Sequence, residues 1–146
     1  MLVSDGKINK FKKGYYEFPL EELEKFESAR SKRKMERKKD YEAPNLSVRN
    51  ILVEADGSVF IALEEYYVVT TTYTDSRGRT TTSTTYYYED MLGAKINASG
   101  NFEWLRKVPK KQRGSRGRGT MSFKLVSDAT GYYFMYLDNK KNLELE

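Results

Sequence analysis

Residues 58–90 have the sequence SVFIALEEYYVVTTTYTDSRGRTTTSTTYYYED. Both halves are rich in β-branched and aromatic residues, which favour strands, and Asp75-Ser76-Arg77-Gly78 between them is a turn sequence. The pattern predicts a long protruding Thr/Tyr hairpin over residues 66–90, which reaches about 30 Å from base to tip at about 3.4 Å per residue. Folding the chain about the turn gives the expected partners: Thr72 with Thr81, Val68 with Thr85, Tyr67 with Tyr86 and Glu64 with Glu89.

Shorter strands are expected on both sides of this hairpin. Apolar and β-branched runs between glycine-containing turns predict strand structure at residues 47–54, 91–97, 102–108, 122–126 and 131–137. A further hairpin is expected over residues 2–18, around Asp5-Gly6. Because consecutive strands then lie side by side, the expected fold is mainly β, an antiparallel meander in a single domain over residues 1–146.

One helix is expected near the N-terminus, as an insert over residues 19–39. Pro19 opens it, acidic residues follow at its positive end and cations collect at its negative end, as the helix dipole favours. The apolar positions Leu20, Leu23 and Phe26, with Met35 as a further candidate, form a narrow stripe. We expect the first half of the helix, about residues 20–29, to pack. The second half has little to bury, and we expect it to fray.

Two types of hairpin alternate along the chain. Placing Gly6 on Gly100 aligns the apolar residues around these two turns. Placing Gly57 on Gly131 does the same for another two turns. A repeated order of short antiparallel strands is typical of propellers and related meanders. The helix and a basic loop are expected to be inserts that differ between the copies.

The segments Ala55–Ala62 and Ala94–Trp104 resemble a bacterial repeat in which an Asp-Gly strand is followed by the pattern K-hydrophobic-D/N-x-x-G-x-x-x-W. This repeat occurs in β-propeller-like proteins of the Bacteroidetes type, which are often exported. The resemblance covers residues 46–69 and 88–137 and implies a propeller-blade-like fold of about one and a half blades, too few to close a ring. It also implies a periplasmic, cell-envelope or extracellular location.

The chain is expected to be a fragment of a larger repeat protein. Strand-like sequence follows Met1 directly, and the last two residues, Leu145-Glu146, resemble residues added by cloning. The expected partner is therefore the rest of the parent chain or another protein. No apolar run is long enough for a membrane span, so no membrane insertion is expected.

The residue types that are missing exclude several kinds of chemistry. The chain has no cysteine and no histidine, so it forms no disulfide, binds no zinc through thiolate or imidazole, and uses no histidine as a general base. We therefore expect a protein that is not an enzyme and has no catalytic residue, no cofactor and no metal site.

The chain has twelve tyrosines, many of them in adjacent pairs. Since neighbours on a strand face opposite sides, some of these rings are exposed and available to stack on a sugar, a base or a partner protein. The alternative is structural, because cross-strand aromatic pairs stabilise a sheet by about 0.2–1 kcal/mol each. The candidate ligand surface consists of Tyr66, Tyr67, Tyr86, Tyr87 and Trp104.

A second candidate surface is basic. Residues 106–118 contain seven lysines and arginines and no acid, and their glycines predict a flexible loop over residues 109–120. Such a loop neutralises nucleic-acid phosphates and releases counterions. The net charge of only +5, without any nucleic-acid-binding motif, favours a solvated loop instead. The candidate polyanion contacts are Lys110, Lys111, Arg113, Arg116 and Arg118.

Carboxylates are the remaining acid–base groups. Glu64 and Glu89, which the expected register places opposite each other, would suit glycoside hydrolysis if they flanked a sugar. The leading hypothesis is a non-enzymatic β-repeat module of a larger exported bacterial protein, which acts in binding or assembly. A nucleic-acid-binding protein and a carbohydrate-binding or carbohydrate-active domain are the alternatives.

Overall fold

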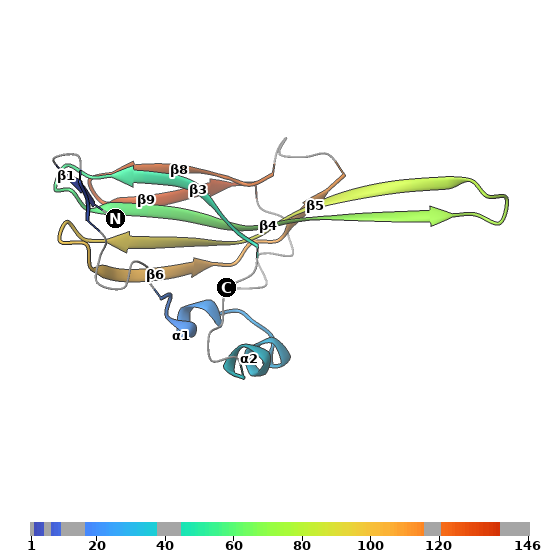
Figure 1. Cartoon of the computed structure of the whole chain (residues 1–146), viewed down its shortest axis with the longest axis horizontal. Helices are drawn as coiled ribbons and strands as arrows, with labels where there is room; N and C mark the ends of the chain where they lie inside the picture. Colours follow the sequence, from blue (N-terminus) through green and yellow to red (C-terminus); the bar gives the residue numbers. More distant parts are fainter. Residues whose placement is uncertain (1, 5–6, 10–16, 38–44, 116–120, 138–146) are drawn as a thin grey trace.

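The computed structural model of the chain describes residues 2–4, 7–9, 17–37, 45–115 and 121–137. Its fold is mainly β with antiparallel sheets, which confirms the predicted fold class (Figure 1). The central sheet has the order β3-β4-β5-β6, and β7 pairs with a different part of β5. The strands of this sheet are β3 (Leu46–Val53), β4 (Val59–Thr74), β5 (Thr80–Ile96), β6 (Phe102–Val108) and β7 (Gln112–Gly114).

β4 and β5 form the long hairpin, which extends far past the other strands (Figure 1). Its register differs by one residue from the prediction, since Thr72 lies opposite Thr82 and Tyr67 opposite Tyr87. The last hydrogen bond before the turn is donated by the Asp75 amide to the Arg79 carbonyl at 2.9 Å. This is a three-residue loop, whereas the prediction assumed a two-residue loop.

Glycine with positive φ makes this loop possible. Gly78 has φ +75° and donates its amide to the Asp75 carbonyl at 3.0 Å. The turns between β3 and β4 and between β5 and β6 repeat the same bonds, with Gly57 at φ +83° and Gly100 at φ +78°. A type I turn followed by a left-handed glycine closes hairpins in this way, and all three turns occur where the sequence predicted them.

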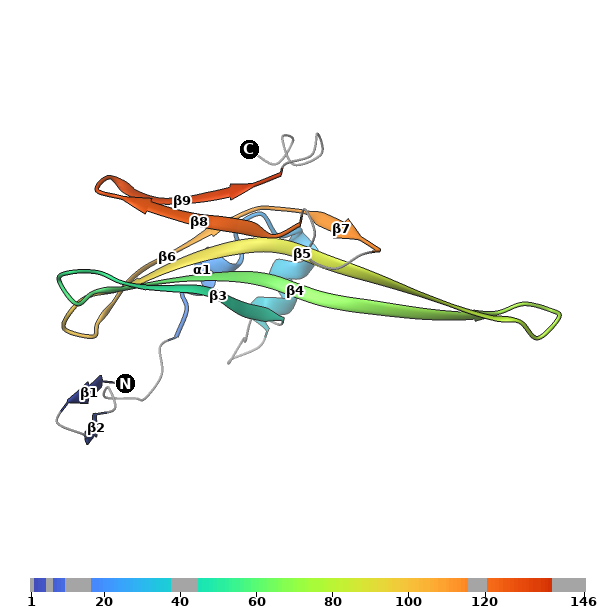
Figure 2. The ribbon, with the colours of Figure 1, turned by 90° about the horizontal axis from the view of Figure 1, so that it is seen from above.

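A second layer lies over one face of the central sheet (Figure 2). It is the two-stranded sheet of β8 (Phe123–Asp128) and β9 (Gly131–Tyr136). Between the layers lies the upper core, whose buried members are Phe60, Ala62, Met91 and Phe123. The Phe60 ring stacks on Tyr132 with centroids 3.7 Å apart.

Trp104 packs in the upper core. Its ring centroid is 5.9 Å from that of Phe60 and 6.4 Å from that of Tyr132. The candidate ligand surface predicted from the sequence therefore loses this residue, because β6 directs it toward the second layer.

Two short helices, α1 (Leu20–Leu23) and α2 (Ala29–Glu36), replace the single predicted helix over residues 19–39. Phe26, at φ +63°, ends the first helical segment. Ser28 begins the second, because its hydroxyl accepts the Ser31 amide at 3.2 Å as an N-cap. The sequence contains no glycine or proline at this break, so no local signal marked it.

The helices contribute to the lower core on the opposite face of the central sheet. Leu23 and Met35 are 6% and 5% exposed, and they join Leu63, Leu92 and Leu105 in one buried cluster. The expectation that the second half of the helix has little to bury and frays is therefore wrong, since the break lets α2 fold back and place Met35 in this cluster. Phe26, which was expected to pack, is 51% exposed instead.

The N-terminal hairpin is present as predicted, with β1 (Leu2–Ser4) antiparallel to β2 (Lys7–Asn9). Its turn lies outside the described residues. The central sheet is open, and the likeness to propeller blades stays a prediction. Gly57 and Gly131, which the expected repeat superimposes, have φ +83° and +158°, so their turns differ. In the described part of the chain no helix has the length and apolar character needed to cross a membrane.

The upper core makes a testable prediction at Gly93. A Cβ atom there would lie 3.0 Å from Cζ and 3.1 Å from Cε2 of Phe60. We expect Gly93→Ala to lower the free energy of unfolding by about 1–3 kcal/mol through overpacking, as measured by urea denaturation. In a Phe60→Leu background the smaller side chain leaves room, so the same change should cost much less. An equal cost in both backgrounds would contradict the contact.

Candidate functional site

A bulge at the base of the long hairpin places three carboxylates on one face. Glu64 lies opposite Met91 and Tyr66 lies opposite Tyr88. Between these paired positions β4 has one residue, Glu65, whereas β5 has two, Glu89 and Asp90. An extra residue in one strand interrupts the alternation of sides, and here Glu65, Glu89 and Asp90 all line one pocket.

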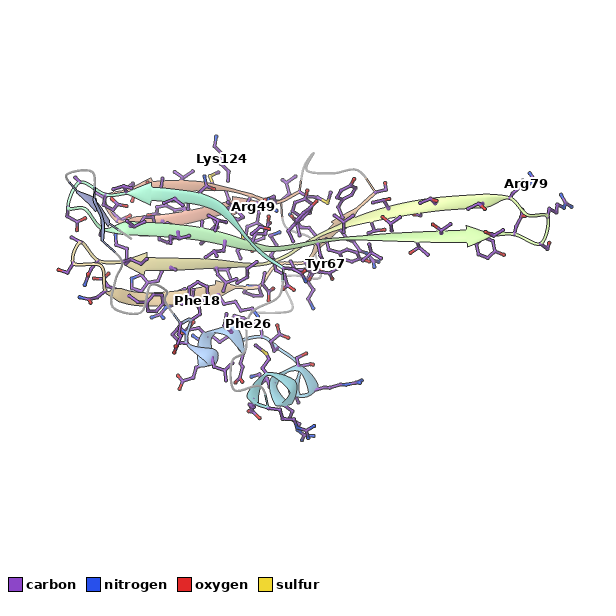
Figure 3. All side chains as sticks on the ribbon, in the orientation of Figure 1. Phe18, Phe26, Arg49, Tyr67, Arg79 and Lys124 are labelled. Carbon is purple, nitrogen blue, oxygen red and sulfur yellow. The ribbon has the colours of Figure 1, made fainter. Side chains whose placement is uncertain are left out.

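The acidic pocket has a volume of about 330 Å³ and lies between the sheet and the helical segment. Figure 3 shows Tyr67 where the hairpin leaves the sheet and Phe26 on the helical segment below it. The pocket combines carboxylates, exposed aromatic surface and small hydroxyl groups. Its lining consists of Phe26, Glu27, Ser28, Ser31, Glu65, Tyr67, Glu89, Asp90, Pro109 and Lys111.

Negative charge exceeds positive charge around this pocket. The buried Lys107 ammonium pairs with Asp90 and with Glu27, both at 2.9 Å, and donates to the Leu23 carbonyl at 3.0 Å. These ion pairs of described residues include neither Glu65 nor Glu89. Burial, followed by the nearby charges of Asp90 and Glu89, raises the pKa of Glu65 to about 7. Burial and the Asp90 charge also raise the pKa of Glu89.

Tyr67 and Phe26 are the aromatic residues of the pocket lining, and Tyr67 stacks on Tyr87. The rings of Tyr67 and Tyr87 lie 4.6 Å apart with an angle of 9° between them. Burial, then the charges of Glu89 and Glu65, raises the pKa of the Tyr67 phenol, so it stays neutral and able to donate. A half-buried aromatic face beside carboxylates attracts cations and repels anions.

The opposite face of the sheet carries a buried charge cluster, made by Arg49, Glu64, Lys110, Gln112 and Ser122. Glu64 and Lys110 form an ion pair of 2.8 Å, and both side chains are 0% exposed. Glu64 Oε2 also accepts from Arg49 Nε at 2.8 Å and from Ser122 Oγ at 2.7 Å. Lys110 donates to the Tyr88 carbonyl at 2.9 Å. The hydrogen bonds explain how two full charges are accommodated inside the protein.

Gln112 extends this cluster to the second layer. Its amide oxygen accepts from Lys110 Nζ at 3.1 Å and from the Ser122 amide at 2.8 Å, and its amide nitrogen donates to the Leu137 carbonyl at 2.6 Å. The cluster therefore ties β7 to the end of the β8–β9 sheet where β8 begins and β9 ends.

The four predicted surface tyrosines divide between the two faces. Tyr66 lies beside Tyr88 at 4.9 Å, and the Arg49 guanidinium lies 5.0 Å from the Tyr66 ring (Figure 3 shows Arg49 on β3). Tyr86, opposite Val68, shares that face, whereas Tyr67 lines the acidic pocket and Tyr87 stacks on Tyr67. They form no single surface, because adjacent residues on a strand point to opposite sides.

The predicted polyanion contact is wrong for Lys110, whose ammonium is buried against Glu64. Residues 112–114 are a strand instead of the predicted flexible loop, since β7 pairs with Tyr86–Tyr88. Lys111 lines the acidic pocket, and Arg113 is exposed on β7. Arg116 and Arg118 lie outside the described residues.

The carboxylate pair considered for glycoside hydrolysis does not exist. Glu64 is buried in the charge cluster and Glu89 lines the pocket on the other face, so the two do not share a site. Among described residues, no group of three or more acidic side chains is arranged to hold a metal ion. Sequence reasoning did not place Phe26, Glu27 and Ser31 in this pocket. The only signal for the pocket in the sequence was the pairs of acids beside the tyrosines.

No family model, curated protein or solved structure matches the chain in comparisons with known proteins.

The charge cluster predicts strong coupling between Glu64 and Lys110. Lys110→Met removes one partner of a buried pair, and we expect it to lower the free energy of unfolding by about 3–5 kcal/mol in urea denaturation. Adding Glu64→Gln removes the second charge, so the double variant should lose less than the sum of the single losses. Lys124→Met, on an exposed lysine of β8, is the control and should change stability by less than about 0.5 kcal/mol. Additive losses would contradict the pair.

The raised pKa of Glu65 predicts a pH dependence of stability. Because its pKa is about 7 in the folded chain, above the ordinary value of 4.5, the folded state holds the proton more tightly between these values. This carboxyl therefore lowers the free energy of unfolding as the pH rises from 4.5 to 7. Above that range Glu65→Gln should be more stable than the wild type by about 1 kcal/mol, after allowance for solvent screening.

At about pH 4 the two proteins should be almost equally stable, because the wild-type carboxyl is then largely protonated in both states. Glu103→Gln, which removes an exposed carboxylate on β6, is the matched control. A stability difference for Glu65→Gln that does not change with pH would contradict the assignment.

Proposed function

We propose that the protein is a non-enzymatic binding module whose acidic pocket accepts a cationic side chain, arginine or lysine, of a protein partner. The observation that carries the proposal is the bulge on β5, which turns Glu89 and Asp90 to the same side as Glu65. In the described part of the chain, Lys107 pairs with Asp90 and Lys111 lines the pocket beside these carboxylates.

The shape and chemistry of the pocket support a single side chain as its occupant. A volume of about 330 Å³ is at the small end of the range for ligand sites. Carboxylates bind a guanidinium through charge-assisted hydrogen bonds, and the Tyr67 ring offers a cation–π contact beside them. A cation in the pocket stabilises the charged form of Glu65, so binding should release a proton and strengthen as the pH rises through about 7.

The wider setting of the module is part of the proposal. The Asp-Gly turn at Gly57 and the Asn-Ala-Ser-Gly turn at Gly100 support the resemblance to exported bacterial repeat proteins. We propose that the module belongs to a larger exported protein of that kind. Nucleic-acid binding is not favoured, because Lys110 is buried and Lys111 stands among carboxylates that repel phosphate.

Short peptides test the pocket directly. A neutral peptide with one central arginine should bind the wild type with a dissociation constant on the order of 1 mM, measured by NMR titration. The same peptide with citrulline, which keeps the shape and lacks the charge, should bind at least about tenfold more weakly.

Variants locate the binding. Glu65→Gln should weaken arginine-peptide affinity by about tenfold, whereas Glu103→Gln, which removes the same charge from β6, should leave it unchanged. Equal affinity for the arginine and citrulline peptides, or equal losses in the two variants, would overturn the proposal.

A further inference from the structure

The outer edge of β4 is open along the projecting part of the hairpin. β3 pairs with β4 only as far as Glu65, and the Tyr66 amide donates to the Asn45 carbonyl at 2.9 Å. From Val68 to Thr74 no described strand pairs with this edge. Figure 2 shows the two strands projecting together as a bare ribbon.

The backbone groups of alternate residues point out of this edge. The Asp75 amide bonds inward to Arg79, and the Tyr66 amide bonds outward to Asn45. Since inward and outward bonding alternate along an antiparallel strand, the even-numbered residues between them all point outward. The outward set consists of Val68, Thr70, Thr72 and Thr74.

No residue of this edge is of a type that prevents pairing with another chain. Proteins protect open strand edges with charges, proline or bulges, because such edges otherwise pair with another chain. Residues 68–74 read VVTTTYT, with no charge, proline or glycine. The tip carries Arg77 and Arg79, while the base of the hairpin carries the acidic pocket. One molecule therefore presents opposite charges at the two ends of the same ribbon.

We propose that two copies of the chain join through this edge, their β4 strands pairing antiparallel so that the tip of each hairpin reaches the acidic pocket of the other. The inference rests on the proposed function of the pocket, because its carboxylates select the register. It names the partner of the pocket as a second copy and the cationic side chain as Arg77.

Symmetry restricts the possible registers. A two-fold axis perpendicular to the ribbon keeps each face continuous, so a residue on the axis faces its own copy. With Thr71 on the axis, Thr70 pairs with Thr72 of the second copy and Val68 with Thr74, which satisfies the whole outward set. The pairing ends there, because Leu46 of β3 already lies opposite Glu65, and the turn of the second copy then places Arg77 at the level of Glu65.

The neighbouring registers fit less well. With Thr70 on the axis, Thr74 meets Tyr66, whose amide is already bonded to Asn45, and Glu65 meets Asp75. With Thr72 on the axis, Val68 falls opposite the turn. The outer edge of β5 is a poorer candidate, because β7 covers its base and brings Arg113 toward the incoming arginines.

Proline variants test the edge without disturbing the hairpin itself. Thr72→Pro removes one outward amide of β4, and Thr82→Pro removes the corresponding outward amide of its cross-strand neighbour on β5. Sedimentation velocity over a dilution series should show the wild type and Thr82→Pro at twice the chain mass of 17.0 kDa, and Thr72→Pro at the single mass. Arg77→Glu should weaken the dimer by at least about tenfold.

A cysteine cross-link tests the register, because the chain has no cysteine of its own. Cβ atoms of directly opposed residues lie about 4.5–5.5 Å apart, close enough for a disulfide to form with small adjustments. Thr71→Cys should therefore give a covalent dimer under mild oxidation. Ser83→Cys, on the same face opposite Thr71, should give much less.

The outcomes separate this inference from the proposed function. A wild type that is monomeric at every concentration, or equal cross-linking of the two cysteine variants, would overturn the dimer even if arginine peptides bind the pocket. Loss of the dimer in Thr72→Pro with retention of peptide binding would support both. A dimer that Arg77→Glu leaves unchanged would overturn the pairing of tip and pocket.

Discussion

The ion pair between Glu64 and Lys110 is the contact on which the arrangement of the layers depends. Two opposite charges in a protein interior compensate their lost hydration only when further hydrogen bonds satisfy them. Here those bonds come from Arg49 on β3, from Ser122 just before β8 and from Gln112 on β7. Segments that are distant in the chain therefore have to meet at one point. The cluster fixes where β7 leaves β6 and where the second layer begins, which apolar packing alone specifies less uniquely.

A single extra residue gives the two faces of the sheet their different chemistry. Along β4, Glu64 points toward the charge cluster and Glu65 toward the acidic pocket, as strand alternation requires. On β5 the bulge breaks that alternation, and Glu89 and Asp90 share one side. Without it, one of these carboxylates would face the second layer. Lys107 meets part of the resulting negative charge, and burial together with the charges of Asp90 and Glu89 raises the pKa of Glu65.

Local sequence patterns predicted the strands, the three glycine turns and the long hairpin, because strand propensity and turn chemistry act over a few residues. The register was missed by one residue, since a two-residue and a three-residue loop differ only in where the glycine bulge closes. The break at Phe26 has no local signal, because the burial of Leu23 and Met35 against the sheet decides it. Lys110 looked like one cation in a basic run, and only the fold brings it to Glu64. Sequence reasoning found the acids beside the tyrosines, but the helical wall of the pocket follows from tertiary packing.

Strands β4 and β5 run without interruption from the tip of the hairpin into the middle of the central sheet. A force that pulls on the tip is therefore carried along both strands to their neighbours β3 and β6, whose hydrogen bonds lie across the direction of pull. The hydrogen bonds of β3 with β4 and of β5 with β6 therefore carry the force in shear and at the same time. In a hairpin that is pulled apart at its ends, the hydrogen bonds break one after another. The long ribbon is thus anchored in the central sheet against a pull along its axis.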